Sequence, residues 1–498
     1  MSSAPYPDPT ALIFPHQPSL SSLLSSLRRS TLSLHNRLAS IRADAAFVAR
    51  AASAFSRPGA HDDGDAGSAS FNAGRNNCSS GRRPRPLVAN ERCGSWYMPP
   101  DRKAASAYFK STDGHERAWK FSTRRLNLHL VDMIEDNDGV IIVDSTRRGK
   151  RMPDALSTTI PIWCTVVNLA LLPSHPLSPN LFLPPHLPPS THAQVSALIP
   201  GFLASLRALD LDLLPRCRLS KPLRPLWVTP DSTLDPDPGP DADGSLFDDY
   251  RPVICCTASR AVRGSEMDEG GYVQGAADDA ENWSCGLTPT LFWDHVDELL
   301  AAPEAELSDM IASLVSQRES ARKDGMAASS SPALSRKSLT SYLSVCPLPL
   351  HTPTAPNTCH IALTSAASTP QDSWTRSPTH MEVGLGRHKT ASRNLRLALP
   401  EICAFAARFL DKGTPSEPTA QVVVACDSGK DVSVGAALAL SCYLFDEHGA
   451  FRVPGEGLSF TKALVKARLG AIMSAFPEAN PSRQTLQSVN SFLMDWRK

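Results

Sequence analysis

The sequence lacks a long apolar run. No stretch reaches the roughly 18 apolar residues that predict a membrane-spanning helix. Residues 1–30 also lack the charged start and unbroken apolar core of a secretory signal. We therefore expect a soluble, cytoplasmic protein that has no membrane partner.

The cysteines show no pattern that is typical of metal binding or cross-linking. The chain has 12 of them, with no CxxC pair and no spacing that suggests a zinc site or a disulfide framework. A zinc-finger domain and a disulfide-stapled domain are therefore excluded, and we expect reduced thiols.

Neither sign of charge is in excess, since 50 Lys and Arg balance 50 Asp and Glu. A polyanion must therefore be bound by a local patch of cations, not by overall attraction. The length of 498 residues is too great for one ordinary core, so we expect at least two domains. The sequence contains no internal repeats and indicates no obligate protein partner.

The composition along the chain divides it into two α/β domains. A mixed α + β N-terminal domain is expected at 20–317, with amphipathic helices at 20–54. Disordered insertions are expected near 56–84 and 230–249, where apolar content falls. The polar, Ser/Ala-rich segment 318–337 is predicted to link it to an α/β domain at 338–498.

One strand end in the N-terminal domain is unusually polar. The apolar run 139–143 predicts a buried strand, and Asp144 follows it directly. We expect Asp144 to bind a divalent cation or a hydroxyl group. The following residues offer hydroxyls and cations to phosphate oxygens: Ser145, Thr146, Arg147, Arg148, Lys150 and Arg151.

A second strand end lies in the C-terminal domain. The strand 422–425, the loop 426–433 and the helix 434–445 resemble the phosphate loop of protein-tyrosine and dual-specificity phosphatases. Candidate phosphate-binding residues there are Cys426, Ser428, Gly429, Lys430, Asp431 and Ser433. Those phosphatases need an arginine six positions after the cysteine, where this chain has Val432. The loop is thus an inactive scaffold that still binds phosphate, a structural turn, or an active phosphatase.

Two acidic clusters have alternative interpretations. The run Ser111, Thr112, Asp113, Gly114 and His115 is either a polar turn or part of the site, with Asp113 or His115 as a general base. Asp278 and Asp279 either cap a helix or, following Gln274, bind Mg²⁺ or a sugar hydroxyl.

Arg124 and Arg125 are interleaved with aromatic residues. They are either a solvated charge run or an RNA contact, because aromatic and basic surface together is usual in RNA-binding proteins. Many of the aromatics must belong to the core in either case. They are Trp96, Tyr97, Tyr108, Phe109, Trp119 and Phe121.

Longer strings carry a family resemblance. The chain resembles the fungal and plant initiator-tRNA 2′-O-phosphoribosyl transferases over most of its length outside the insertions. The matching strings lie at 36–38, 88–97, 109–115, 125–130, 143–156, 272–275, 278–279, 283, 426–431, 480–483 and 486–494.

This resemblance implies an N-terminal transferase domain and a C-terminal domain like that of a dual-specificity phosphatase. It implies a pentosyltransferase that moves a 5-phosphoribosyl group from 5-phosphoribosyl 1-pyrophosphate to the 2′-hydroxyl of adenosine 64 of initiator methionine tRNA. That modification reserves the tRNA for translation initiation. Mg²⁺ is expected, and Arg124, Arg125 and Arg483 are expected to contact RNA. The alternatives are a non-catalytic phosphate- or RNA-binding protein built on an inactive phosphatase, or an atypical phosphatase using Cys426.

Overall fold

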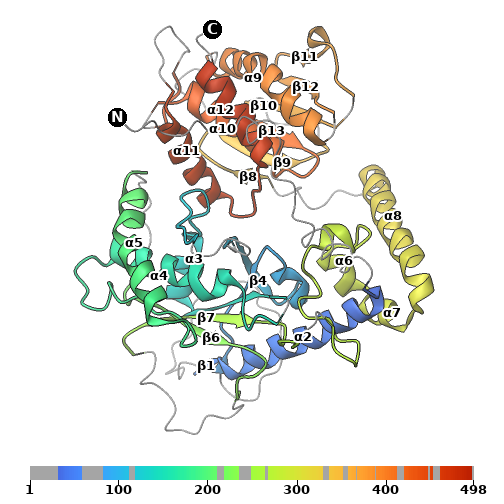
Figure 1. Cartoon of the computed structure of the whole chain (residues 1–498). Helices are drawn as coiled ribbons and strands as arrows, with labels where there is room; N and C mark the ends of the chain where they lie inside the picture. Colours follow the sequence, from blue (N-terminus) through green and yellow to red (C-terminus); the bar gives the residue numbers. More distant parts are fainter. Residues whose placement is uncertain are drawn as a thin grey trace, which may run out of the picture.

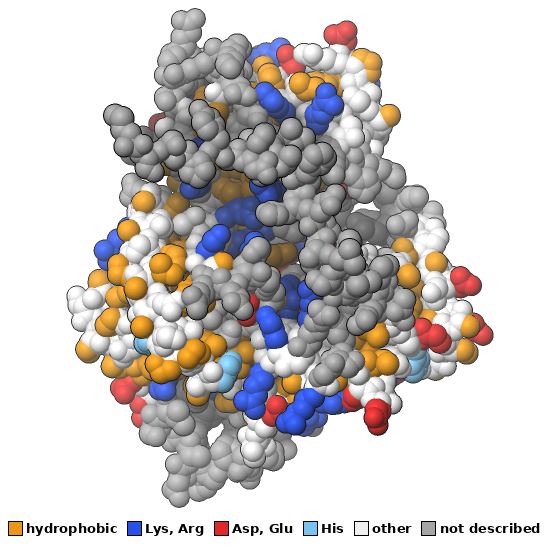
Figure 2. Space-filling model, viewed as in Figure 1, with side chains coloured by type: hydrophobic (Ala, Val, Ile, Leu, Met, Phe, Trp, Pro, Cys, Tyr) orange, Lys and Arg blue, Asp and Glu red, His pale blue; other side chains and the backbone are white. Residues whose placement is uncertain are grey.

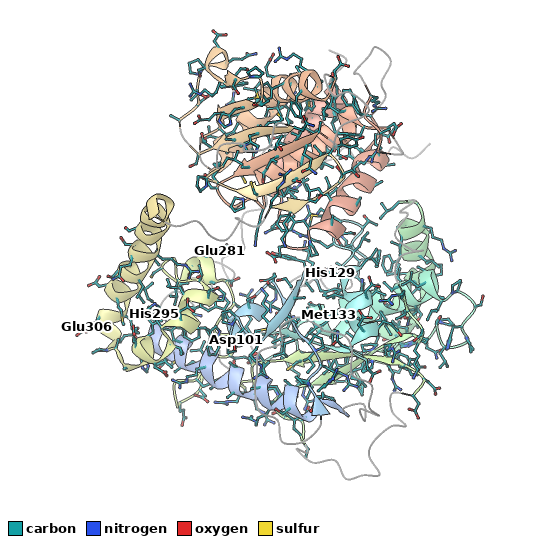
Figure 3. All side chains as sticks on the ribbon, turned by 180° about the vertical axis from the view of Figure 1, so that it is seen from behind. Asp101, His129, Met133, Glu281, His295 and Glu306 are labelled. Carbon is teal, nitrogen blue, oxygen red and sulfur yellow. The ribbon has the colours of Figure 1, made fainter. Side chains whose placement is uncertain are left out.

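Two apolar runs form inner strands of two separate sheets. Val140–Asp144 is strand β5 and Gln421–Cys426 is strand β13, and the apolar side chains of both are buried. Continuous apolar runs of this kind suit parallel strands that are covered on both faces. In the computed structural model, each run lies inside the sheet of its own domain, and the two domains are stacked (Figures 1 and 3).

The structure describes most of the chain. The described residues are 32–58, 82–110, 118–147, 149–209, 218–234, 248–263, 267–328, 336–350, 357–365, 367–386, 388–411, 420–446, 449–452 and 460–495.

The N-terminal sheet has five strands, and all of its neighbouring pairs are parallel. Its order is β4-β3-β5-β7-β6. The strands are β3 (Leu87–Asn90), β4 (Lys103–Ala107), β5, β6 (Leu223–Val228) and β7 (Arg251–Thr257). A separate short pair joins β1 (Arg57–Pro58) to β2 (Arg82–Arg83).

Helices cover both faces of this sheet. Ile141 and Val143 point into one core and Val140 and Ile142 into the other, as the alternation of a strand requires. The first face is covered by α2 (Leu34–Ala54), α6 (Pro289–Asp294), α7 (Val296–Ala301) and α8 (Glu304–Ala328). The second is covered by α3 (His129–Asp136), α4 (Ile160–Leu171) and α5 (Pro189–Arg207).

The strand order contains a topological switch point. The chain leaves β3 toward β4 at one edge, whereas it leaves β5 toward β7 and β6 at the other. The carboxyl ends of β3 and β5 are neighbours, and their connections diverge there. In open α/β sheets this crevice is where ligands bind.

The C-terminal sheet has six strands in the order β11-β12-β10-β13-β9-β8, parallel in its four central strands and antiparallel at both edges. The strands are β8 (Lys337–Ser338), β9 (Leu343–Pro347), β10 (Thr358–Thr364), β11 (Thr375–Ser377), β12 (His380–Gly384) and β13. Four helices share its main core: α9 (His388–Leu410), α10 (Val432–Leu444), α11 (Lys462–Ala475) and α12 (Arg483–Asp495).

The predicted α/β class is confirmed. The N-terminal domain is more regular than the mixed α + β arrangement that was expected, because its sheet is parallel throughout. Helix α8 continues to Ala328, so residues 318–328 are helical, although they were expected to begin the linker. Most of the expected insertions lie outside the described residues, at 59–81 and 235–247. Within the described chain, the helices are all too short or too polar to cross a membrane.

Candidate site at the switch point

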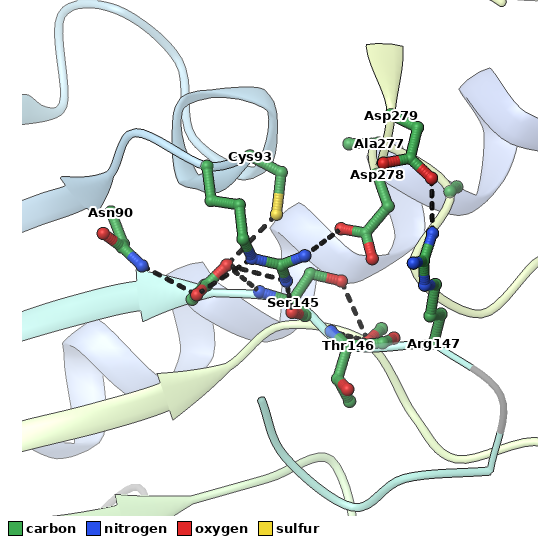
Figure 4. A network of polar contacts seen from close by, with 12 residues as sticks. Asn90, Cys93, Ser145, Thr146, Arg147, Ala277, Asp278 and Asp279 are labelled. Atoms are coloured by element: carbon green, nitrogen blue, oxygen red, sulfur yellow. Dashed lines mark hydrogen bonds and ion pairs between the residues drawn. The ribbon is translucent and has the colours of Figure 1, made fainter. Parts of the chain in front are cut away.

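The crevice between β3 and β5 is closed by a hydrogen bond between the last residues of the two strands. Asn90 Nδ2 donates to Asp144 Oδ2 at 2.8 Å (Figure 4). The same amide donates to the carbonyl of Phe109 at 3.0 Å and accepts from its N–H at 2.8 Å. Asn90 therefore ties the segment after β4 to the ends of the two inner strands.

Asp144 is fully buried, and donors surround its carboxylate. Its Oδ1 accepts from the backbone N–H of Ser145 at 2.7 Å and lies 3.1 Å from the thiol of Cys93. Arg92 Nη2 lies 3.2 Å from the same oxygen. Since Asn90 occupies Oδ2, Asp144 is an anchor for its neighbours in this arrangement, and its oxygens do not face an open ligand position.

Arg92 connects two buried carboxylates. Its guanidinium lies 3.2 Å from Asp144 and 3.2 Å from Asp278, whose side chains are both fully buried, while 26% of the Arg92 side chain is exposed. Burial alone lowers the pKa of Arg92, but the two carboxylates outweigh it and hold that pKa well above its usual value. Arg92 is therefore a permanent cation at the crevice. Burial, reinforced by the nearby carboxylates, raises the pKa of the Cys93 thiol, so Cys93 is not a nucleophile here.

Ser145 and Thr146 belong to a buried hydroxyl network. Tyr97 OH donates to Ser145 Oγ at 3.0 Å, and Ser145 Oγ donates to Ser259 Oγ at 3.0 Å. Ser259 Oγ in turn donates to the carbonyl of Thr146 at 2.9 Å. These contacts fix the turn that leaves β5.

Gln274 holds the basic loop after that turn. Its Oε1 accepts from the N–H groups of Gly149 and Val262, both at 2.8 Å, and its Nε2 donates to the carbonyl of Lys150 at 2.8 Å. The next residue, Gly275, has φ +63°, and a Cβ there would lie 2.7 Å from the carbonyl oxygen of Thr146. This position therefore requires glycine.

The cations of the loop lie at the rim of the crevice. Arg147 forms an ion pair with Asp279, and Lys150 lies 3.5 Å from Asp154, yet 38% and 45% of the two basic side chains are exposed. Arg151 is exposed as well. Such partly exposed cations can bind phosphate oxygens by exchanging a carboxylate partner.

The carboxylates at the switch point are each in an ion pair. Asp144 and Asp278 are held by Arg92, and Asp279 is held by Arg147. The described part of the chain contains no group of three or more His, Cys, Asp or Glu side chains placed to hold a metal ion. Metal binding by Asp144, Asp278 and Asp279 therefore stays a prediction, and it would require each carboxylate to leave its arginine.

Some of the predicted residues lie outside the described chain. They are Ser111, Thr112, Asp113, His115 and Arg148. Conversely, sequence reasoning missed Asn90 and Arg92. Their one local signal is the short apolar run 87–89 that precedes them, and the pairing of that run with β5 comes from the structure.

The Cys426 loop is bound to its own domain. Cys426 is buried, and its Sγ lies 3.1 Å from Ser433 Oγ. Asp431 accepts from Ser482 N at 2.8 Å and from Thr485 Oγ1 at 2.7 Å, and Lys430 forms a 2.9 Å ion pair with Glu478. The Ser428 hydroxyl accepts from the N–H of Lys430 at 3.2 Å.

The structure also shows where the loop glycine and the predicted RNA-binding arginines lie. Gly429 has φ +67° and lies against Pro347 and Cys346, leaving no space for a Cβ.

Arg125 donates to the carbonyl of Ala479 and to Asn480 Oδ1, both at 2.6 Å, so it joins the two domains. Arg124 and Arg483 are exposed.

Fold and site define a two-domain α/β protein with a basic loop at the topological switch point of one domain and a phosphatase-like loop in the other. A family model described as "Rit1 N-terminal domain" matches residues 27–316, and one described as "Rit1 DUSP-like domain" matches residues 379–493. The chain belongs to the Rit1 family, and the predicted family is thereby confirmed.

Two relatives extend over both domains. An uncharacterised protein of Schizosaccharomyces pombe is 37% identical over 430 residues, which cover 82% of this chain and 88% of the relative. The tRNA A64-2′-O-ribosylphosphate transferase of Saccharomyces cerevisiae is 32% identical over 467 residues, covering 82% of this chain and 87% of the relative. No solved structure matches.

Proposed function

We propose that this chain is a tRNA-modifying pentosyltransferase that acts on initiator methionine tRNA. The donor is 5-phosphoribosyl 1-pyrophosphate and the acceptor is the 2′-hydroxyl of adenosine 64. The observation that carries the proposal is the 32% identity, across both domains, to a yeast enzyme named tRNA A64-2′-O-ribosylphosphate transferase.

The switch-point crevice supports this reaction chemically. The acceptor oxygen forms a bond to C1 of the donor ribose, the bond from C1 to pyrophosphate breaks, and the hydroxyl proton passes to a base. Pyrophosphate leaves with high negative charge, so fixed cations lower the barrier by binding it as that charge develops. In this proposal Arg147, Lys150 and Arg151, which are partly or fully exposed, perform this task, with Arg148 as a further cation assigned from the sequence.

Arg92 adds a cation that is held inside the crevice. Asp144 and Asp278 fix its guanidinium from two sides, so the position of this charge is set before the donor binds. In this proposal Asp144 is a positioning residue for Arg92, and Ser145 and Thr146 shape the turn. Mg²⁺ arrives as part of the donor, bound to its pyrophosphate, because the carboxylates of the site are already paired.

The general base is proposed from the sequence alone. Asp113 and His115 are proton acceptors in a polar run that follows β4, and Asn90 binds the backbone of that same segment at Phe109. Asp113→Asn and His115→Gln, tested singly, separate the two candidates. The base is the residue whose loss lowers the rate constant for transfer without raising the KM for donor.

The proposed activity is tested with initiator tRNA, Mg²⁺ and donor labelled in the ribose or 5-phosphate. We expect label in tRNA, with none in a matched tRNA that carries 2′-deoxyadenosine at position 64. Binding of tRNA without label transfer would favour the non-catalytic alternative, and release of phosphate that needs Cys426 would favour a phosphatase.

A further inference from the structure

Helix α11 and the 123–124 segment meet at a pocket between the two domains. It has a volume of about 230 Å³, and three of its lining side chains are basic: Arg124 from the N-terminal domain, and Lys462 and Lys466 from α11. All three are exposed. Figure 2 shows Lys and Arg side chains gathered where the two domains meet.

The two lysines are placed unfavourably for the stability of the helix. Lys462 and Lys466 are four residues apart, so they lie on the same face of α11, and like charges at this spacing destabilise a helix. Within the described part of the chain, neither lysine has an ion-pair partner that would relieve this repulsion. The pocket floor is apolar, with Val465, Leu469 and Leu486. An anion in this pocket would relieve the repulsion among the three cations.

The same segment contributes to a second pocket, through Ser122 and Arg125. That pocket measures about 210 Å³ and is also lined by Tyr108, Phe109, Lys110, Lys120, Phe121 and Trp163, among others. Arg125 stands at its wall with its guanidinium 4.3 Å from the centre of the Tyr108 ring and two bonds to the C-terminal domain.

This aromatic and basic pocket leads back to the switch point. Phe109 lines the pocket and is hydrogen-bonded to Asn90, which in turn binds Asp144. A long polyanion that lies along the domain junction would therefore pass close to the proposed donor crevice.

We propose that the junction surface formed by Arg124, Lys462 and Lys466 binds backbone phosphates of double-helical RNA in the tRNA substrate. The phosphatase-like domain thus binds the tRNA through α11, whereas the N-terminal domain binds the donor. Cations on two facing elements suit an A-form duplex, which proteins recognise by its shape and its phosphates. This inference rests on the proposed function for the identity of the RNA.

The test uses the full chain and fluorescently labelled initiator tRNA. The Lys462→Gln/Lys466→Gln variant is compared with wild type by fluorescence anisotropy between about 50 and 200 mM salt. We expect the Kd at low salt to rise roughly tenfold, and the slope of log Kd against log salt to become shallower by about 2, one for each lost phosphate contact. The KM for donor should not change.

A matched control removes two exposed cations, Arg376 and Arg408, beside the amino ends of β10 and β13, at the opposite end of the C-terminal sheet from the Cys426 loop (Figure 1). The Arg376→Gln/Arg408→Gln variant should bind tRNA as wild type does. An unchanged Kd and slope in the α11 variant would overturn the inference, as would an equal loss in the control variant or a wild-type chain that binds no tRNA. Binding that depends on α11 without any label transfer would instead refute the proposed function and leave the RNA surface standing.

Discussion

The two strand-end loops of this protein differ in the number of cations that they carry. The loop after β5 carries partly exposed cations at a topological switch point. The loop after β13 resembles a phosphate loop, but Lys430 is its one cation, and this lysine is ion-paired and partly exposed just as Arg147 is. A buried strand followed by a polar loop thus defines a place for a phosphate, while the number of cations in the loop decides how strongly one can bind.

The second loop also lacks the arginine that phosphatase activity requires, in agreement with this difference. Val432 stands where active phosphatases need an arginine, and a lysine cannot supply the bidentate contact of a guanidinium. The carbonyl of Lys430 also accepts from the N–H of Asn480 at 2.8 Å, and Asn480 is bound by Arg125 of the other domain. The loop thus supports the domain junction.

The largest effect is expected from loss of Arg92. Arg92→Ala leaves Asp144 and Asp278 buried without their cation, which should lower the free energy of unfolding by about 3–5 kcal/mol. Urea unfolding measures this loss. Arg218→Ala removes an exposed ion pair with Asp136 and serves as the control, with a change of less than about 1 kcal/mol. Equal stability of the two variants would show that Arg92 does not anchor the crevice.

The next largest effect is expected on the transfer rate of variants that still fold as wild type does. Arg147→Ala and Lys150→Ala should each lower kcat/KM for donor by roughly 10–100-fold, about 1.4–2.7 kcal/mol, because each removes a cation from the leaving pyrophosphate. Both residues are partly exposed, so the free energy of unfolding should change little. Steady-state transfer rates check this, and wild-type turnover in both variants would remove the β5 loop from the site.

A smaller effect of pH is expected at the second loop. The hydrogen bond and charge of Lys430 hold the pKa of Glu478 below its usual value of 4.5. A depressed carboxyl pKa stabilises the folded state above the unfolded pKa, and this contribution is lost as the pH falls through the folded value. The stability advantage of wild type over Glu478→Gln should therefore be a few tenths of a kcal/mol at pH 7 and should shrink below pH 4.5.

Thermal unfolding of wild type and Glu478→Gln at pH 7 and at a pH below 4.5 measures how the stability advantage changes. A constant gap between wild type and Glu478→Gln across the range would mean that the Lys430–Glu478 pair does not hold the loop.

The smallest effect is expected at Cys426. Cys426→Ser should leave transfer within about twofold of wild type, because the thiol bonds only within its own loop and the arginine of a phosphatase is absent. Transfer assays and a phosphatase assay on the same preparation check this. Loss of transfer in Cys426→Ser would assign the second loop to the reaction.

Three inner strands were predictable from the sequence, and the edge strands of the N-terminal sheet were not. β5, β7 and β13 are continuous apolar runs that are buried on both faces. β4 reads Lys-Ala-Ala-Ser-Ala, and β6 contains Pro225, so neither shows an apolar run. Both lie at edges of the sheet, where exposure weakens the hydrophobic pattern and proline is tolerated.

The site was only partly predictable for a related reason. The cations after Asp144 follow a strong strand signal, whereas Arg92 follows a four-residue strand, and its importance comes from Asp278, which is 186 positions away along the chain. No local sequence pattern predicts the strand order that brings these residues together. The sequence likewise does not predict the hydrogen bond between Arg125 and Asn480, which joins the two domains.

Direct binding of the donor tests the central comparison most sharply. Calorimetric titration of 5-phosphoribosyl 1-pyrophosphate with Mg²⁺ into wild type, Arg147→Ala and Lys430→Ala compares one cation from each loop. The account predicts that Arg147→Ala raises the Kd for donor at least tenfold, about 1.4 kcal/mol, while Lys430→Ala leaves it unchanged. A raised Kd in Lys430→Ala with wild-type binding in Arg147→Ala would contradict it and place the donor at the phosphatase-like loop.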